Sequence, residues 1–214
     1  MEVACESFLQ SLPIAKLDIV ILLAFYTTNA NSPIFIEAEM VDKITISGLP
    51  GSGTSTIANL LQKKLGFKHV NTGEIFRELA INHKMSLQEF EEYCESNPQI
   101  DRKIDKKQEE ILRKGNIILE GRLAGWIAHL KKIDAFKIWL DCEQNERIKR
   151  IINREGGNFF EKKEEVKNRE RSEKRRYLKF YGIDLDDKSI YDVVIDTTNL
   201  KPEEIVKKIL ERLK

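Results

Sequence analysis

The feature that most constrains this chain is a glycine-rich turn at Gly48–Ser55, which reads Gly-Leu-Pro-Gly-Ser-Gly-Thr-Ser. It fits the phosphate-loop pattern G-x-x-x-x-G-K-[ST] at every position except the lysine. A short β-branched run, Ile44–Ser47, precedes the turn, and a helical pattern of apolar residues through Leu65 follows it. Glycines let successive backbone N–H groups curve around an anion, and the helix N-terminus adds positive potential. The sequence therefore predicts an α/β fold that binds a phosphate at this turn.

Two positions of the turn bear on its chemistry. Ser55 stands where a hydroxyl group ligates Mg²⁺ in the general pattern. Thr54 stands in the lysine position, so the usual positive charge on the β- and γ-phosphates is missing. Either another cation reaches the phosphates or the protein does not turn over ATP. The arginines described below favour the first reading, because a guanidinium group can fork around phosphate oxygens.

Strand and helix patterns alternate from Lys43 to the end of the chain. Five short apolar runs are expected to be strands, at 44–47, 67–70, 116–120, 136–140 and 192–195. No hairpin signal joins them, so right-handed βαβ units and one parallel sheet follow. We expect a three-layer α/β sandwich with a five-stranded parallel sheet, forming one domain over 40–214.

Capping residues indicate where helices begin and end. Thr72 is expected to cap a helix that runs to about Leu79, and Ser86 opens a capping box with Glu89. Pro202 suits the first position of the last helix. Further helices are expected over 57–65, 99–114, 143–154 and 161–181.

Residues 1–39 differ from the rest of the chain. They carry Lys16 and five acidic side chains, a net charge of −4, whereas the whole chain carries +1. Their apolar run Ile19–Tyr26 is far shorter than the roughly 20 residues that span a bilayer, and the acidic leader is unlike a signal peptide. We expect an appendage outside the functional fold, Met40 as a candidate true start and a cytoplasmic location. An extra strand or helix packed on the domain is the alternative.

Positive charge is concentrated in 147–176, where twelve Lys and Arg face six Asp and Glu. Arg147, Arg150 and Arg154 recur at spacings of three and four, so we expect them to face one way on a helix. The pair Gly156-Gly157 separates them from a second arginine-rich helix. Part of this stretch is ordinary solvated helix with Glu–Lys pairs. The arginine bias at a glycine joint still favours a mobile basic lid, at about 155–181, that closes over phosphates.

Three candidate residues lie at or just after the carboxyl ends of the second and third expected strands, where α/β proteins bind ligands. Arg77 lies on the first turns of the helix after the second strand, and Arg122 lies just beyond the third. Glu120 ends the third strand, where a buried carboxylate is costly unless it is bound or solvated. A Mg²⁺ ion or its water shell is one partner for Glu120, and the backbone or the phosphate loop is the other.

With these elements in order, the chain resembles a nucleoside monophosphate kinase, specifically the archaeal-type cytidylate kinases. The resemblance covers about 40–214. It rests on the segments ISGLPGSGTST, NTGEIFRELA, NPQIDRKID, LEGRLAGW and NREGG, followed by RERSEKRRYLKFYGID and SIYDVVIDT. Members of that family commonly read GSGT in the phosphate loop, so the Thr54 departure is expected.

The resemblance implies an activity, cofactors and site residues. The implied reaction is the ATP-dependent phosphorylation of CMP and dCMP in pyrimidine nucleotide metabolism. Mg²⁺ is expected near Ser55 and Glu120, and helices are expected to bind the monophosphate. No nucleic-acid or membrane partner is expected. A monomer is expected. The implied residues for the ATP phosphates are Gly48, Leu49, Pro50, Gly51, Ser52, Gly53, Thr54, Ser55 and Thr56. The implied catalytic arginines are Arg77, Arg122, Arg169, Arg171 and Arg176.

Several alternatives stay open at the level of sequence. The acceptor could be AMP or UMP, the protein could bind nucleotide without catalysis, or the basic face could bind nucleic acid. The last reading is weakened by the interleaved acids and the scarcity of aromatics. Candidate base-reading residues, which spacing does not rank, are Glu74, Asp101, Arg102 and Asp105. The scattered cysteines and histidines suggest neither a disulfide framework nor a metal site, and we assign the histidines no chemistry.

Overall fold

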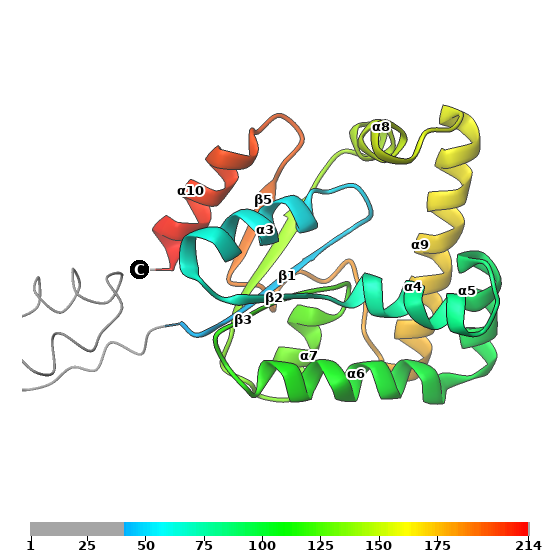
Figure 1. The fold of residues 1–214 in the computed structure, drawn as a ribbon, viewed down its shortest axis with the longest axis horizontal. Coiled ribbons are helices and arrows are strands. Elements are labelled where there is room, and N and C mark those ends of the chain that lie inside the picture. The colour runs from blue at the N-terminus through cyan, green and yellow to red at the C-terminus, as the bar shows by residue number, and fades with distance from the viewer. Residues whose placement is uncertain (1–40, 214) are drawn as a thin grey trace, which may run out of the picture. The chain divides into compact units, whose positions relative to one another are not determined.

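The five predicted strands form one parallel sheet in the computed structural model, which describes residues 41–213 (Figure 1). The strand order is β2-β3-β1-β4-β5, so β1 lies at the centre and β2 and β5 form the edges. The strands are β1 (Lys43–Gly48), β2 (Lys68–Asn71), β3 (Ile117–Glu120), β4 (Phe136–Asp141) and β5 (Val193–Asp196). The expected α/β class and the five-stranded parallel sheet are confirmed.

Helices connect the strands. They are α3 (Thr54–Leu65), α4 (Thr72–Asn82), α5 (Leu87–Ser96), α6 (Pro98–Leu112), α7 (Ala124–Leu130), α8 (Gln144–Glu155), α9 (Phe159–Tyr181) and α10 (Pro202–Arg212). The Ser86–Glu89 capping box forms as expected, and Pro202 is the first residue of α10. The stretch 147–176 folds as α8 and α9, which are joined at Gly156 and Gly157.

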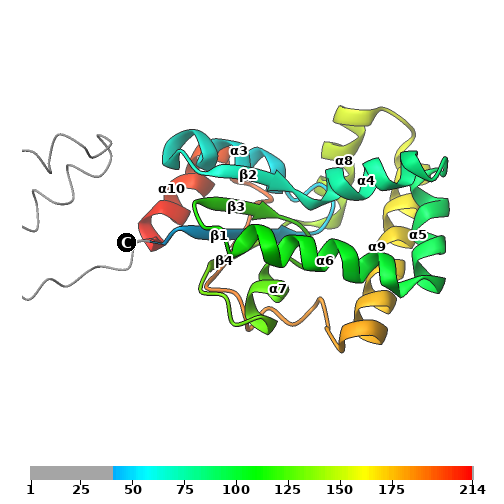
Figure 2. The ribbon, with the colours of Figure 1, turned by 60° about the horizontal axis from the view of Figure 1, so that its bottom comes forward.

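Helices α3 and α10 cover one face of the sheet and α6 and α7 cover the other (Figure 2). An apolar layer fills the space on each face. Side chains alternate along β3, because successive residues of a strand point to opposite faces. Ile117 and Leu119 pack with α6 and α7, whereas Ile118 packs with α3 and α10. The predicted continuous apolar strand is therefore buried on both sides, which is the usual setting of a parallel sheet.

Two local expectations need correction. Helix α7 was not expected, and five of its seven residues are buried, so it shows no polar face and no amphipathic period. The helix cap near the second strand is Asn71, whose side chain accepts from the backbone N–H of Glu74, rather than Thr72. Thr72 is the first residue of α4, and its hydroxyl instead donates to the backbone carbonyl of Glu120 at 2.7 Å.

The phosphate loop is a tight turn between β1 and α3. Gly51 and Gly53 adopt positive φ angles of 81° and 97°, which side chains disfavour. A Cβ atom at Gly51 would lie 2.5 Å from the backbone oxygen of Arg147, and one at Gly48 would lie 2.6 Å from that of Leu140. The glycines are therefore required both by backbone conformation and by the close approach of α8 and β4.

Several sequence expectations concern residues 1–40, which lie outside the described residues. These are the appendage, the candidate start at Met40 and the apolar run Ile19–Tyr26. Among residues 41–213, no helix has both the length and the apolar character needed to cross a bilayer. Cys94 and Cys142 are buried and unpaired within this part of the chain.

We predict that Gly51→Ala destabilises the protein more than Gly66→Ala. Both glycines have positive φ, but a Cβ at Gly66 meets nothing within 4 Å. The Gly66 variant should therefore lose only the conformational term of about 1 kcal/mol. The Gly51 variant must also displace the Arg147 backbone. Urea unfolding of both variants measures the difference, and equal losses would show that the contact with Arg147 is unimportant.

Candidate functional site

Strand register brings the carboxyl-terminal ends of β1, β2 and β3 side by side at one end of the sheet. Glu120 of β3 pairs with Ile46 of β1 and with Asn71 of β2. Because the strands are parallel, the phosphate loop after β1 lies beside the chain that follows β2 and β3. Open α/β sheets bind their ligands at this carboxyl-terminal end of the strands.

Glu120 is the centre of a hydrogen-bond network at this end of the sheet. One carboxylate oxygen accepts from the hydroxyls of Thr54, at 2.7 Å, and Ser55, at 2.5 Å. The other oxygen lies 3.0 Å from Nε2 of His69. Burial of the carboxyl opposes its ionisation, but the hydrogen bonds from His69, Ser55 and Thr54 outweigh burial and lower the pKa of Glu120. The carboxylate is thus ionised and held against the start of α3.

A small cavity of about 60 Å³ lies beside this network, between α4, α6, α9 and the chain after β3. It holds a few water molecules at most. Apolar side chains of Phe76, Leu123 and Tyr177 line part of it. The rest of the lining is polar and comprises Thr72, Asp101, Asp105, Gln108, Arg122, Arg169, Glu173 and Arg176, with Gly73 and Ile104 completing it.

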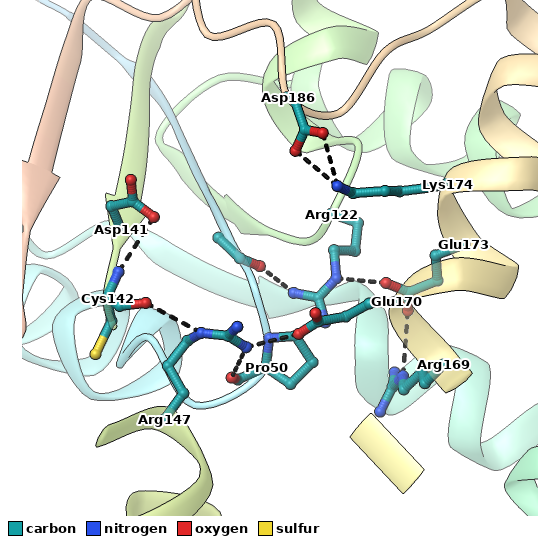
Figure 3. Close-up of polar contacts among 11 residues, drawn as sticks. Pro50, Arg122, Asp141, Cys142, Arg147, Arg169, Glu170, Glu173, Lys174 and Asp186 are labelled. Carbon is teal, nitrogen blue, oxygen red and sulfur yellow. Dashed lines mark hydrogen bonds and ion pairs between the residues drawn. The ribbon is translucent and has the colours of Figure 1, made fainter. Parts of the chain in front are cut away.

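Arg122 links the phosphate loop to the cavity (Figure 3). One of its terminal nitrogens donates to the backbone carbonyl of Gly48, and its Nε donates to Glu173 at 2.6 Å. Glu173 also accepts from Nε of Arg169 at 3.1 Å. Although burial of Glu173 favours its neutral form, the two arginines lower its pKa to about 2. Glu173 therefore holds the two guanidinium groups next to the phosphate loop.

Asp101 and Arg176 form a second charged pair in the lining of the cavity, and Glu91 contacts Arg169 without lining the cavity itself. Arg176 is 3% exposed, and its Nε lies 3.4 Å from Asp101. Burial raises the pKa of Asp101 although Arg176 opposes the change. Glu91, from α5, pairs with Arg169 at 3.0 Å, yet burial outweighs that arginine and raises the pKa of Glu91 to about 7.

The structure separates the arginines that the resemblance implies. Arg122, Arg169 and Arg176 line the cavity. Arg77 is exposed on α4 and does not line the cavity. It lies next to Gly73, which does: a Cβ atom added at Gly73 would lie 3.5 Å from a terminal nitrogen of Arg77. Arg171 instead lies with Glu95, Ser172 and Arg175 in a surface groove between α5 and α9, outside the cavity.

The three arginines of α8 do not converge as expected. Arg147 is buried, and it donates to the backbone oxygens of Pro50 and Cys142 and to Glu170 (Figure 3). Arg150 reaches the backbone oxygens of Thr197 and Thr198. Arg154, at the end of the helix, is 65% exposed and pairs with Glu155. Only the first two therefore pack around the phosphate loop and the chain after β5.

Sequence reasoning missed several residues of this site. His69 was assigned no chemistry, and its contact with Glu120 depends on the β2–β3 register, which spacing does not reveal. Glu173 does carry a signal, because it lies four residues after Arg169 and three before Arg176 on one helix. Tyr181 also contributes, since its hydroxyl donates to Asp105.

Comparisons with known proteins bear on this geometry. Residues 43–199 match the sequence profile described as the cytidylate kinase-like family. A cytidylate kinase of Methanococcus vannielii is 50% identical over 158 residues, which cover 72% of this chain and 90% of the relative. A cytidylate kinase of Thermococcus kodakarensis is 46% identical over 173 residues, covering 79% and 88%.

A solved structure is similar in fold. A gluconokinase from Sinorhizobium meliloti has a TM-score of 0.55 at 12% identity and covers 81% of this chain and 92% of its own. At that identity the likeness concerns the fold alone.

We predict that Glu173→Gln destabilises the protein by about 3 kcal/mol at neutral pH, because it leaves two partly buried arginines short of a counter-charge. The native pKa of Glu173 is lowered, so its contribution is present above the ordinary pKa of 4.5 and is lost toward pH 2. The difference between wild type and variant should therefore shrink by about 1 kcal/mol between pH 6 and pH 3.5. Urea unfolding at both pH values measures it.

Glu164→Gln is the matched control, since Glu164 lies on the same helix but is 60% exposed and pairs only with Lys167. Its effect should stay below about 0.5 kcal/mol at both pH values. A Glu173 variant as stable as this control would show that the buried ion pairs contribute little.

Proposed function

This chain belongs to the cytidylate kinase-like family, and from that premise we propose that it transfers the γ-phosphoryl group of ATP to CMP or dCMP. The products are ADP and CDP or dCDP. The observation that carries the proposal is the position of Arg122, which contacts the phosphate loop at Gly48 and also lines the neighbouring cavity. One guanidinium group thereby joins a donor site to an acceptor site.

The donor phosphates are assigned to the loop from Gly48 to Thr56. Its backbone N–H groups and the N-terminus of α3 supply positive potential without a lysine. The hydroxyl of Thr54, in the lysine position, is engaged by Glu120. The charge that the lysine supplies elsewhere is therefore assigned to arginines from other elements, with Arg122 the nearest to both sites.

The residues at this end of the sheet fit a Mg²⁺ ion. Ser55 and Glu120 place a hydroxyl and an ionised carboxylate within 2.5 Å of each other, and hard oxygen ligands are those that Mg²⁺ prefers. Mg²⁺ is usually held by one or two carboxylates and the substrate phosphates. When bound, the ion would neutralise negative charge on the ATP phosphates. His69 and Thr54 would keep Glu120 oriented toward it.

The acceptor phosphate is assigned to Arg77, Arg122 and Arg169. Arg77 makes no hydrogen bond or ion pair within residues 41–213. The contacts of Arg169 with Glu91 and Glu173 use its Nε, which leaves its terminal amino groups for a phosphate. An oxygen of the acceptor phosphate attacks the γ-phosphorus as the bond to the bridging oxygen breaks. Positioning and charge neutralisation suffice for this step, so the site needs no strong general base.

The cavity is too small for a nucleotide as it stands. A volume of about 60 Å³ accommodates a few waters, so the residues that line it must move for CMP to enter. Helices α6 and α9 each contribute four residues to the lining, and we assign the movement to α9 because the pair Gly156-Gly157 precedes it. This fits the mobile lid expected at 155–181.

A coupled ADP-release assay with Mg-ATP tests the proposal on the full chain. The acceptors are CMP, dCMP, UMP, AMP and GMP, and turnover should be fastest with CMP or dCMP. Preference for AMP or UMP would keep the kinase mechanism and reject the acceptor. Nucleotide binding without turnover of any acceptor would reject the kinase activity and leave a nucleotide-binding protein.

We predict that Arg169→Ala lowers kcat with CMP by about 10²- to 10³-fold, the usual cost of one lost charge-stabilising donor. Arg171→Ala should stay within about twofold of wild type, because Arg171 lies outside the cavity. The two variants remove the same charge from the same helix. Similar losses in both would show that charge on α9, rather than contact with the phosphates, governs turnover.

A further inference from the structure

Arg169 is shared between two carboxylates that come from different helices. Its Nε lies 3.0 Å from Glu91 of α5 and 3.1 Å from Glu173 of α9 itself. Both residues are buried, with 6% and 4% of their surface exposed. Helices α5 and α9 lie side by side at the right of Figures 1 and 2. The single N–H at Nε donates to Glu173, so Glu91 is held to the arginine by an ion pair.

The two carboxylates differ in how firmly they keep their charge. Burial of Glu173 is outweighed by Arg122 and Arg169, which lower its pKa to about 2. Burial dominates at Glu91 and raises its pKa to about 7, although Arg169 opposes the change. Two acids on one guanidinium group are thus pushed apart by their surroundings, and such a pair divides into a permanent charge and a titrating one. Glu91 is the carboxylate that further negative charge would protonate.

The charges around Arg169 balance in the free protein. The three arginines are Arg122, Arg169 and Arg176, and the three carboxylates are Glu91, Glu173 and Asp101. A phosphate monoester adds nearly two negative charges above its second pKa of about 6. Arg77 supplies one more positive charge, so a phosphate at this site would leave one negative charge uncompensated. Such a charge is costly where water is excluded, and one proton on Glu91 removes it.

Glu91 also has access to solvent. It lines a groove of about 330 Å³ between α5 and α9, and Arg169 lines both that groove and the cavity. A proton can therefore reach Glu91 without passing the nucleotide. The other charged groups of the groove are Glu92, Glu95, Glu165, Arg171 and Arg175.

Two further titratable groups lie on the remaining sides of α5. Burial raises the pKa of Cys94 to about 12. His83, which follows α4, packs against Phe90 and Tyr93 of α5. A Glu91 variant that retains both groups separates their titration from that of Glu91.

We propose that Glu91 takes up a proton when the acceptor phosphate binds, so that Arg169 keeps Glu173 and the phosphate as its charged partners. The inference rests on the proposed function, which assigns that phosphate to Arg169, and deepens it. The proton comes from solvent and binds a carboxylate oxygen of Glu91, and no bond of the nucleotide changes. Glu91 is a positioning residue: its charge balances Arg169 in the free protein and is cancelled once phosphate replaces it. Because the ionised form of Glu91 opposes the phosphate, acceptor binding weakens as the pH rises.

Calorimetric titration with CMP, in the absence of ATP, measures the proton directly. Titrations at pH 8 in two buffers of different ionisation enthalpy give the number of protons taken up, and the phosphate is already a dianion there. Wild type should take up about 0.5 to 1 proton per CMP. Glu91→Gln should take up less than about 0.2, because the amide does not titrate. Glu92→Gln is the matched control, since Glu92 is the next residue on α5 and exposed, and it should match wild type.

The pH dependence of the CMP affinity tests the same step on wild-type protein alone, which keeps the proposal testable if the variant does not fold. The Kd of wild type should rise about threefold to tenfold between pH 7.5 and pH 8.5, as Glu91 ionises in the free protein. The Kd of Glu91→Gln should stay within about twofold over the same range.

The outcomes separate this role from the proposed function. Wild-type protein that binds no CMP and phosphorylates no acceptor would overturn the proposed function, and this inference with it. Wild-type protein that phosphorylates CMP, yet binds it with a constant Kd from pH 7.5 to pH 8.5, would overturn the role of Glu91 alone. Equal proton uptake by wild type and a folded Glu91→Gln variant would overturn that role equally.

Discussion

The site depends on pairing each buried guanidinium group with a carboxylate of the protein. An uncompensated buried charge costs several kcal/mol, so each arginine of the cavity needs an opposite charge from the protein. Glu173 forms ion pairs with Arg122 and Arg169. Glu91 pairs with Arg169, and Asp101 pairs with Arg176. These carboxylates come from α5, α6 and α9. The same contacts that neutralise the arginines therefore hold the three helices around the cavity.

The sheet fixes the other half of the site. Parallel register sets Glu120 beside the start of α3, where its contacts with Thr54 and Ser55 join β3 to the phosphate loop. A carboxylate there is stable because the hydroxyls and His69 compensate for its burial. The rigid part of the site is thus assembled by backbone pairing, whereas the part formed by α9 is assembled by ion pairs between side chains.

Local patterns predicted the fold well but the site only in part. The β-branched runs, the glycine turn and the Ser86 capping box are short-range signals, and the structure confirms them. Helix α7 gave no signal because five of its seven residues are buried, which leaves no amphipathic period. Arg169 lines both the cavity and the groove between α5 and α9, whereas Arg171, two residues later on α9, lines only the groove. The partners of the arginines depend on which helices meet, and a single sequence does not specify that.

The Thr54 substitution connects these observations. A lysine in the loop carries its charge to the phosphates as soon as the loop forms, because both belong to one strand–turn–helix unit. Here Thr54 in that position donates to Glu120, and the proposed function assigns the positive charge to Arg122 and to the arginines of α9. Full neutralisation of the phosphates therefore requires α9 to be seated.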